Sequence, residues 1–367
     1  VARRGGRPHW GMAPSPDAAH LTALTALAAE LPDGALITDP DRMAGYRFDR
    51  AAAPDAGVPL AVARVGCTED VQSVVRFAAA HGIPVVTRGA GTGLSGGATA
   101  LDGCLVLSTE RMRAIAVDPA TRTVTVQPGL LNKEVKAAAA EHGLWYPPDP
   151  SSYEICSIGG NIATNAGGLC CVKYGVTTDY VLGLTVVPAD GTAVKLGGPR
   201  LKDVAGLPLT KLFVGSEGTL GVITEVVLRL LPAQRLPGTL VATFGVLSDA
   251  TDAVVELTRA MRPSMLEFMD HVSIDAVEDV AHMGLDRTAA AMLVMQSDEA
   301  AGAAAVELAV MEEICSRHNA SEVFATDDPE EGESFVVARR MAIPAVERRG
   351  SLLLEDVGVP VPRLSDL

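Results

Sequence analysis

The stretch Thr87-Arg-Gly-Ala-Gly-Thr-Gly-Leu-Ser-Gly-Gly97 decides the fold of the first part of this chain. Five of its eleven residues are glycine, a residue that adopts positive φ without strain and lets the backbone approach a ligand closely. Consecutive amides in such a loop form a concave surface that binds anions. No acidic residue lies between Pro84 and Leu101 to repel a phosphate. The stretch therefore predicts a binding site for a phosphate-bearing cofactor.

A nicotinamide dinucleotide is one such cofactor, because the spacing Gly91-x-Gly93-x-x-Gly96 fits the dinucleotide fingerprint and Asp118 stands where a ribose-binding acid would be expected. That fingerprint also needs a helix that starts at the loop and points its N-terminus at the phosphates. Here Asp102-Gly103 forms a turn and a strand follows it. No Gly-Lys-Ser/Thr follows the glycines either, so neither a Rossmann nor a P-loop site is favoured.

A second loop of the same kind follows. Pro147-Pro-Asp-Pro-Ser-Ser152 stiffens the chain, and Ser157-Ile-Gly-Gly-Asn-Ile-Ala-Thr-Asn-Ala-Gly-Gly168 adds four glycines and several small polar side chains. No acid occurs between Ile155 and Thr178. Two tight turns remain the plain alternative. Together the loops favour one large phosphate-bearing ligand that is held from two sides.

Composition restricts the class of protein. The 367 residues suggest two domains, and the net charge of −15 argues against a nucleic-acid binder. No CxxC pair occurs among the six cysteines, so metal-ligand spacing is missing; adjacent Cys170 and Cys171 could be redox-active or simply reduced thiols. No apolar run reaches the length of a membrane helix. Residues 1–16 are expected to be a disordered leader and no signal peptide.

The hydrophobic pattern predicts mixed helix and strand. Thr68 is expected to cap a helix that ends at Gly82, whose buried face carries Val71, Val74, Val75 and Ala78. A long stretch, 145–180, is expected to be irregular. Further helices are expected at 17–31, 130–142, 248–261, 300–318 and 328–341. Strands are expected at 60–65, 83–87, 104–108, 114–118, 123–127, 181–188, 192–196, 222–230, 239–245, 266–269, 292–296, 321–325 and 352–354.

Four motifs together resemble a known family. They are Thr87–Gly97, Pro147–Ser152, Ile158–Gly168 and Lys211-Leu-Phe-Val-Gly-Ser-Glu-Gly-Thr-Leu-Gly-Val-Ile-Thr224. They are similar to the FAD-binding domain of the vanillyl-alcohol oxidase/p-cresol methylhydroxylase (PCMH-type) superfamily. Within it they most resemble the group that contains the FAD-linked subunit of glycolate oxidase, D-lactate dehydrogenase and D-2-hydroxyglutarate dehydrogenase. The likeness runs from about Tyr46 to the end of the chain.

The resemblance implies an α+β fold and a domain order. A helical segment (17–56) precedes a two-subdomain FAD-binding domain (57–234). An α+β, ferredoxin-like cap domain (235–367) supplies the substrate pocket and is incomplete at its C-terminal end.

The resemblance also implies which residues hold FAD. The pyrophosphate would lie on Arg88, Gly89, Ala90, Gly91, Thr92, Gly93, Leu94, Ser95, Gly96 and Gly97. The flavin would be lined by Asp149, Pro150, Ser151, Gly159, Gly160, Asn161, Ala163, Thr164, Asn165 and Gly168. The adenine or ribose end would meet Glu217, Gly218, Gly221 and Ile223. Some members attach FAD covalently through a histidine in the first loop, and because residues 88–97 contain none, non-covalent FAD is expected.

On the substrate side, Arg339 matches the arginine that holds the substrate carboxylate in the family; a solvated arginine pair on a helix face is the alternative. Ile343 and Leu354 stand where the family has a threonine and a lysine, which argues against a dicarboxylate such as 2-hydroxyglutarate. Asp356 falls at an acidic position of structural character. The family's later His-rich segment with Gly-Asp-Gly-Asn does not occur in this sequence, so a C-terminal truncation is expected, and a divalent metal only together with that segment.

The expected activity is FAD-dependent oxidation of a small D-2-hydroxy acid, of the D-lactate or glycolate type, to the 2-oxo acid. Two alternatives stay open: a catalytically silent FAD-binding subunit of a multi-subunit oxidase, and an alcohol or sugar oxidase of the same superfamily. The electrons would pass to a quinone, a cytochrome or an iron–sulfur partner. A cytoplasmic location is expected, with peripheral contact to the inner face of the membrane and a homodimer as options.

Overall fold

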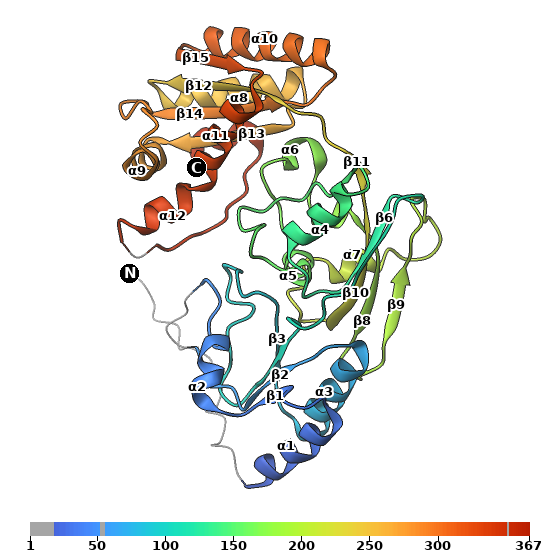
Figure 1. The fold of residues 1–367 in the computed structure, drawn as a ribbon. Coiled ribbons are helices and arrows are strands. Elements are labelled where there is room, and N and C mark those ends of the chain that lie inside the picture. The colour runs from blue at the N-terminus through green and yellow to red at the C-terminus, as the bar shows by residue number, and fades with distance from the viewer. Residues whose placement is uncertain (1–17, 52–55, 351) are drawn as a thin grey trace. The chain divides into compact units, whose positions relative to one another are not determined.

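The computed structural model describes residues 18–51, 56–350 and 352–367 (Figure 1). The predicted leader at 1–16 lies outside these residues. The chain divides into two compact units. The first unit comprises the chain up to His142 together with Ser152–Ala166 and Tyr180–Leu230, and the second comprises Gly143–Ser151, Gly167–Asp179 and Leu231–Leu367. The domain limits stated above stay a prediction.

The first unit contains a small, mainly parallel sheet and a larger antiparallel sheet. Its elements are α1 (Ala18–Glu30), β1 (Leu36–Ile37), α2 (Pro40–Met43), η1 (Ala44–Tyr46), β2 (Ala61–Arg64), α3 (Thr68–His81), β3 (Val85–Arg88), β4 (Leu105–Ser108), β5 (Ile115–Asp118), β6 (Thr123–Val126), α4 (Asn132–Ala140), α5 (Ile158–Ala163), β8 (Val181–Val187), β9 (Val194–Gly197), α7 (Thr210–Phe213) and β10 (Val222–Arg229).

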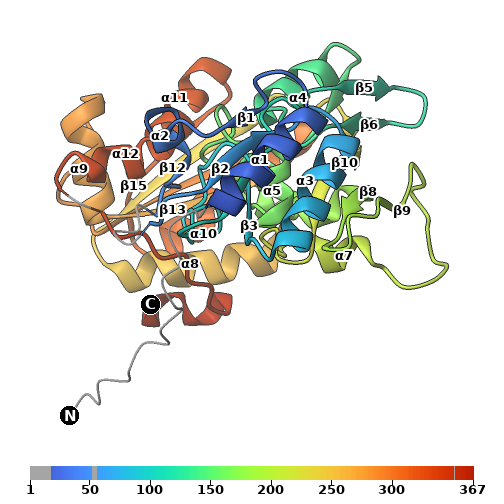
Figure 2. The ribbon, with the colours of Figure 1, turned by 90° about the horizontal axis from the view of Figure 1, so that it is seen from below.

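The small sheet has the order β1-β2-β4-β3, and β4 runs parallel to both β2 and β3. Its strands are buried on both faces, as is usual for parallel strands. One face packs against α1 and α3, which lie side by side in Figure 2. The glycine loop leaves the sheet at the carboxyl end of β3, where Arg88 is paired with Ser108. The sheet therefore fixes the point from which the loop starts.

The predicted start of α3 is wrong by one residue. Thr68 has joined the helix, and Cys67, with extended φ and ψ of −147° and 174°, is its N-cap residue. A carboxylate supplements the cap from within the helix, because Asp70 Oδ2 accepts a hydrogen bond from the Gly66 amide. The predicted end is confirmed, since Gly82 adopts φ +64°.

The larger sheet has the order β5-β6-β10-β8-β9 and is antiparallel throughout. The hairpin of β8 and β9 around Asp190-Gly191 is confirmed. The expectation of an irregular stretch at 145–180 is partly wrong, because α5, the helix α6 (Cys171–Tyr174) and the 3₁₀ turn η2 (Thr177–Asp179) lie within it. Because glycine has a low helix propensity, Gly159 and Gly160 in the first turn of α5 do not indicate a helix in the sequence. Ser157 caps this helix by accepting a hydrogen bond from the Gly160 amide.

The second unit is built on a four-stranded antiparallel sheet of order β13-β14-β12-β15. Its elements are β7 (Leu144–Trp145), α6 (Cys171–Tyr174), η2 (Thr177–Asp179), β11 (Leu231–Pro232), β12 (Gly238–Phe244), α8 (Leu247–Ala260), β13 (Met265–Asp270), α9 (His271–Ala281), β14 (Ala291–Ser297), α10 (Ala301–Arg317), β15 (Ala320–Thr326), α11 (Pro329–Arg340), α12 (Ala342–Glu347) and η3 (Val361–Asp366).

This sheet order is the ferredoxin-like one, with an extra helix, α9, between the second and third strands. Alternate side chains of each strand enter two separate cores. One core forms with α8 and α10 and the other with α9, α11 and α12, as the helices on either side of the sheet in Figure 1 show. The α+β fold class is confirmed for both units.

The predicted strand at Leu352–Leu354 is wrong. Residues 352–360 are irregular, and the side chain of Leu353 is 83% exposed. In the described part of the chain these residues pair with neither edge of the sheet. An apolar run forms a strand only where a neighbouring strand can accept and donate the backbone hydrogen bonds, and no such neighbour lies here among the described residues.

One buried carboxylate ties α6 to the sheet of the second unit. Asp298 follows β14, and its side chain is 2% exposed. It accepts a hydrogen bond from Lys173 Nζ at 2.7 Å, a short one from the Tyr174 hydroxyl, and one from Gln234 Nε2 at 3.1 Å. Burial alone would raise the pKa of Asp298, but these hydrogen bonds outweigh it and hold the pKa below its ordinary value.

Among the described residues, the helices fall short of the length and apolarity that a membrane crossing would need.

We expect Asp298→Asn to lower the free energy of unfolding at pH 7 by about 1–3 kcal/mol, because three donors lose an ionised partner. A lowered carboxyl pKa contributes stability above the ordinary carboxyl pKa, and that stability disappears as the pH falls through the lowered value. The difference between wild type and variant should therefore shrink in acid. Urea unfolding followed by the fluorescence of Trp145, whose ring lies 4.8 Å from that of Tyr174, checks this.

The matched control is Asp252→Asn, which removes an exposed carboxylate from α8 of the same unit. It should leave the unfolding curve unchanged at both pH values. A gap between wild type and Asp298→Asn that stays constant from pH 7 to pH 3 would contradict the ionised-partner explanation.

Candidate functional site

The glycine loop of the first unit rests on a buried cation. Arg88, only 8% exposed, donates from Nη1 to the carbonyl of Phe48 at 2.7 Å and from Nη2 to that of Gly45 at 3.4 Å. Burial lowers the pKa of Arg88, and nearby Asp49 opposes that change. Its side chain therefore supports the loop from inside the protein.

Gly91 crosses directly over this cation. Its φ is +73°, and a Cβ at this position would lie 2.3 Å from Nη2 of Arg88. Both the backbone conformation and the space therefore require glycine here. A Cβ on Gly93, two residues later, would have no other atom within 4 Å, so there is space for a side chain at this position.

A carboxylate fixes the far end of the loop. Asp49, which is buried, accepts hydrogen bonds from the Ala98 amide at 3.2 Å and the Thr99 hydroxyl at 3.1 Å. The Arg50 amide also donates to the carbonyl of Gly93. No local sequence pattern indicates this role of Asp49, because its partners lie about fifty positions away along the chain.

The backbone amides between the two supports face no protein acceptor. Within the described residues, the amides of 91–97 donate no hydrogen bond to another part of the chain. Residues 91–97 are half-buried or exposed, and an open run of amides in a glycine loop can form an anion-binding concavity. The loop can therefore receive a phosphate through its backbone.

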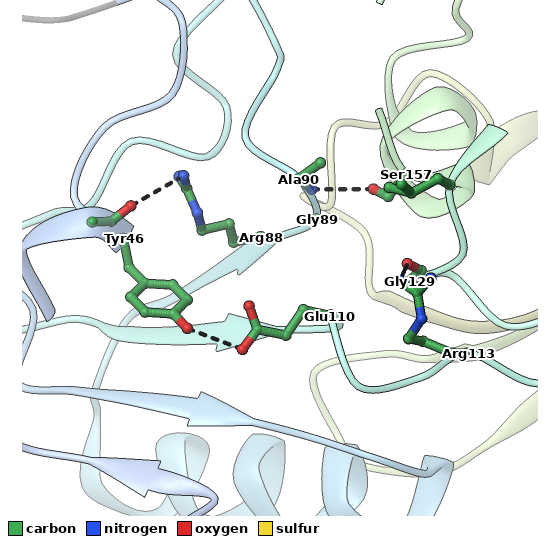
Figure 3. Close-up of a pocket in the computed structure, with 10 residues that line it drawn as sticks. Tyr46, Arg88, Gly89, Ala90, Glu110, Arg113, Gly129 and Ser157 are labelled. Atoms are coloured by element: carbon green, nitrogen blue, oxygen red, sulfur yellow. Dashed lines mark hydrogen bonds between the residues drawn. The ribbon is translucent and has the colours of Figure 1, made fainter. Parts of the chain in front are cut away.

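Ser157 joins the two glycine-rich loops. Its Oγ accepts a hydrogen bond from the Ala90 amide at 3.2 Å (Figure 3) and another from the Gly160 amide at 3.3 Å. A Cβ on Gly89 would lie 2.3 Å from the same oxygen, and a Cβ on Gly159 would lie 2.6 Å from Cβ of Pro128. The glycines of both loops thus permit the close approach of the Ser157 and Pro128 side chains to the loop backbone.

The Gly-Ser-Glu-Gly segment completes this meeting of loops. The amides of Gly215 and Glu217 donate to the carbonyls of Ile162 and Ala163 at the end of α5. Glu217 adopts φ +51° and its carboxylate accepts a hydrogen bond from Ser95 Oγ at 3.1 Å. Three segments distant in sequence therefore converge beside the carboxyl end of β3.

Two of the predicted cofactor residues, Asn161 and Ile223, are buried in the first unit, whereas Thr164 is exposed. The side chain of Asn161 is buried, accepts from Asn132 Nδ2 at 3.0 Å and donates to Cys156 Sγ at 3.1 Å. Thr164 donates to the Gly160 carbonyl. Ile223 is buried within β10 opposite Val186. Their roles in binding stay predictions.

Several other residues of the predicted cofactor set have a positive φ or a close neighbour that restricts the side chain. Asn165 and Gly218 have positive φ of 50° and 76°, Gly96 has φ +84°, and Gly221, at φ +157°, lies against the Val187 carbonyl. A Cβ on Gly97 would lie 2.8 Å from Oε2 of Glu217.

A cavity of about 280 Å³ opens beside the start of the glycine loop. The close-up in Figure 3 shows its wall, which is formed by Gly45, Tyr46, Arg88, Gly89, Ala90, Glu110, Arg113, Gly129, Leu131 and Ser157. The charged side chains of this wall are already paired. Arg113 binds both carboxylate oxygens of Glu134 at 2.6 Å, and Glu110 accepts from the Tyr46 hydroxyl at 2.9 Å.

In the second unit, the predicted flavin-lining residues gather around Asp149. Its Oδ2 accepts a hydrogen bond from Arg340 Nη2 at 3.0 Å, and its Oδ1 accepts from the Cys170 amide at 3.3 Å. A Cβ on Gly168 would lie 2.3 Å from Oδ1. Pro150 and Ser151 belong to the same unit. Asp149 therefore links its own loop to the loop at Cys170 and to the end of α11 through hydrogen bonds.

The two adjacent cysteines of this region have different partners. Cys170 Sγ donates to Asp149 Oδ1 and to the Pro147 carbonyl, both at 3.2 Å, while Cys171 Sγ accepts from the Gly168 amide at 2.8 Å. Burial raises the pKa of Cys171, which disfavours the reactive thiolate. Neither cysteine forms a disulfide.

Arg339 lies in the last turn of α11 and points at a carboxylate of β13. Its Nε is 2.8 Å from Oε2 of Glu267, and the two side chains are 27% and 16% exposed. Burial raises the pKa of Glu267, and the charge of Arg339 opposes this. The geometry differs from a solvated arginine pair on a helix face. No group of three or more His, Cys, Asp or Glu side chains suited to a metal ion occurs in the described chain.

Comparison with known proteins bears directly on this geometry. Residues 59–197 match the family of FAD binding domains, and residues 236–367 match the C-terminal domain of FAD linked oxidases. The glycolate oxidase subunit GlcD of Bacillus subtilis is 38% identical over 325 residues, which are 88% of this chain and 69% of that protein. The chain thus spans about two thirds of the length of this relative.

A D-lactate dehydrogenase of Archaeoglobus fulgidus is 42% identical over 239 residues, 64% of this chain and 54% of the relative. The structure of p-cresol methylhydroxylase with substrate bound has a TM-score of 0.74 at 18% identity and covers 88% of this chain and 68% of its own; it shows the shared fold. The order of loops, the two domains and these similarities agree, and the chain belongs to the FAD-linked oxidases, the family of flavin-dependent oxidoreductases that includes the glycolate oxidase subunit GlcD.

Proposed function

We propose that this FAD-dependent oxidoreductase holds its cofactor non-covalently and oxidises small D-2-hydroxy acids with a single carboxylate, of the D-lactate or glycolate type, to 2-oxo acids. The named relatives support the reaction class. The observation that carries the substrate side is Arg339, a partly exposed guanidinium on a fixed helix end whose Nε is paired with Glu267.

The first unit fits a cofactor with a pyrophosphate. The open amides of 91–97 suit its anionic oxygens, and the glycines of both loops remove the Cβ atoms that would fill the cradle. We assign Gly91–Gly97 to the pyrophosphate, and keep Glu217 and Gly218 as the residues of the adenosine end. FAD, when bound, supplies the two-electron acceptor for the substrate C–H bond.

The second unit fits a carboxylate substrate. The planar guanidinium of an arginine can bind both oxygens of a carboxylate at once. Among the described residues the two Nη nitrogens of Arg339 have no protein acceptor, and Glu267 forms an ion pair at 2.8 Å from Nε. Arg339 would therefore bind and orient the acid. Ile343 and Leu354, both apolar, add no cation for a second carboxylate.

The partners remain part of this proposal. The similar protein of Bacillus subtilis is named as a subunit of glycolate oxidase. A quinone, a cytochrome or an iron–sulfur protein is proposed as the electron acceptor, and the cytoplasm as the location.

Gly91→Ala should destabilise the loop by about 1–3 kcal/mol, because alanine is strained at φ +73° and its Cβ would displace Arg88. We expect a lower free energy of unfolding of the apoprotein and weaker binding of FAD in a fluorescence titration. Gly93→Ala is the control in the same loop, and it should leave apoprotein stability unchanged. Equal losses of stability in the two variants would show that Arg88 does not impose the constraint.

The FAD should leave the polypeptide on denaturation, because the first loop provides no histidine for a covalent bond. Acid precipitation of the loaded protein, followed by absorbance at the flavin band, measures this. Yellow colour in the supernatant is expected. Flavin that stays in the washed pellet would overturn the proposal of non-covalent binding.

Arg339→Ala should cost about 2–4 kcal/mol in kcat/KM for D-lactate or glycolate, because a charge-assisted double hydrogen bond to the carboxylate is lost. Anaerobic bleaching of the flavin band gives the rate. Arg348→Ala, which removes an exposed arginine next to α12, is the control and should behave like wild type. Flavin content and thermal unfolding identify a variant that fails only because it is misfolded.

Two outcomes of this experiment favour the alternatives. If no 2-hydroxy acid bleaches the flavin of the wild-type chain, a catalytically silent subunit is favoured. If an alcohol or sugar bleaches the flavin equally well with and without Arg339, an oxidase of neutral substrates is favoured.

A further inference from the structure

Glu267 occupies a position where the strand pattern calls for an apolar side chain. Met265 and Met269, two residues before and after it on β13, are both buried in the core beneath α9 and α11. Residues two apart on a strand share a face, so Glu267 belongs to that same face. A carboxylate there is costly unless a cation pairs with it, and Arg339 provides that cation at 2.8 Å.

The charges around this pair sum to zero. The groups that act electrostatically on Glu267 are Arg339, Arg340 and Asp149. Arg340 is itself paired with Asp149 at 3.0 Å. Two cations therefore face two carboxylates, all on side chains that are at most 27% exposed. Without Glu267 the same cluster would carry one positive charge.

We propose that Glu267 is a specificity-determining residue, which holds Arg339 through an ion pair and limits binding at Arg339 to acids that carry one carboxylate. This inference rests on the proposed function, because it concerns the substrate that Arg339 binds. A monocarboxylate brings the cluster to one net negative charge, whereas a dicarboxylate brings it to two. In a partly buried site each surplus charge is weakly screened, so the second carboxylate carries the larger penalty.

The second part of the role is orientation. The Glu267 carboxylate lies 2.8 Å from Nε of Arg339 without an aligned hydrogen bond. The contact is therefore an ion pair, and it leaves the two Nη nitrogens available to an incoming acid. The strand fixes Glu267 and the helix end fixes Arg339. Glu267 would thus position the arginine without touching the substrate.

Glu267→Gln is the test, because glutamine keeps the shape and removes the charge. The probes are pyruvate and 2-oxoglutarate, whose binding to the FAD-loaded full chain is measured by calorimetry. Removing one negative charge favours a divalent anion more than a monovalent one. We expect the ratio of the two dissociation constants to shift by about tenfold toward 2-oxoglutarate. The same shift is expected between D-lactate and D-2-hydroxyglutarate in anaerobic flavin bleaching.

Glu267→Asp separates charge from position, since it keeps the charge but withdraws it by one methylene. It should keep the wild-type preference for one carboxylate while kcat falls through a less well oriented Arg339. Glu256→Gln removes a carboxylate that pairs with Arg317 elsewhere in the same unit, and it should leave both ratios unchanged.

Distinct results identify which proposal fails. An unchanged ratio in Glu267→Gln, with active wild-type protein, overturns the role of Glu267 and leaves the proposed function standing. Failure of every 2-hydroxy acid to bleach wild-type flavin overturns the proposed function, while the binding ratio of the two 2-oxo acids still decides the role of Glu267. If neither 2-oxo acid binds to wild type or variant, the role of Glu267 is overturned as well.

Discussion

The buried guanidinium of Arg88 is the group on which the cofactor side of this structure depends. It lies at the end of a strand and binds carbonyls of residues 45 and 48, which belong to a segment about forty positions earlier. Because a buried cation without partners would be very costly, this segment, the strand and the loop above must keep one arrangement. The conformation of the loop, with its amides open, therefore depends on the Arg88 guanidinium and its two carbonyl partners. The acid-free sequence adds the complementary condition, since no carboxylate within the loop competes for those amides.

Glycine serves two different purposes in these loops. At Gly91 the requirement is both conformational and spatial, because φ is positive and Arg88 fills the place of a Cβ. At Gly89 the requirement is spatial alone, because Ser157 approaches from the second loop. A count of glycines in the sequence indicates a ligand site, but it does not distinguish these two cases. The distinction becomes visible only when the three converging segments are placed in space.

Periodicity predicted most of the fold, since α3, the β8–β9 hairpin and the alternating elements of the second unit carry strong local patterns. It failed where partners are distant or weakly patterned. Cys67 rather than Thr68 caps α3, and Leu352–Leu354 has apolar residues but no strand beside it. The glycine loops were recognisable from sequence, whereas the support from Asp49 was not, because fifty residues separate the two. Arg339 was identified by resemblance, but its pairing with Glu267 required the register of β13.

The two units follow one electrostatic rule. In the first unit, Arg88 is hydrogen-bonded to backbone carbonyls and Arg113 to Glu134, so the donors left open at the loop are neutral amides. In the second unit, each arginine at the end of α11 has a carboxylate opposite it. A free cation would bind any anion strongly and select poorly, whereas a cation that is already balanced favours the ligand whose shape matches its remaining donors. Under the proposed function, selectivity in a chain with a net charge of −15 would come from the local charge balance and the direction of a few N–H groups more than from the overall field.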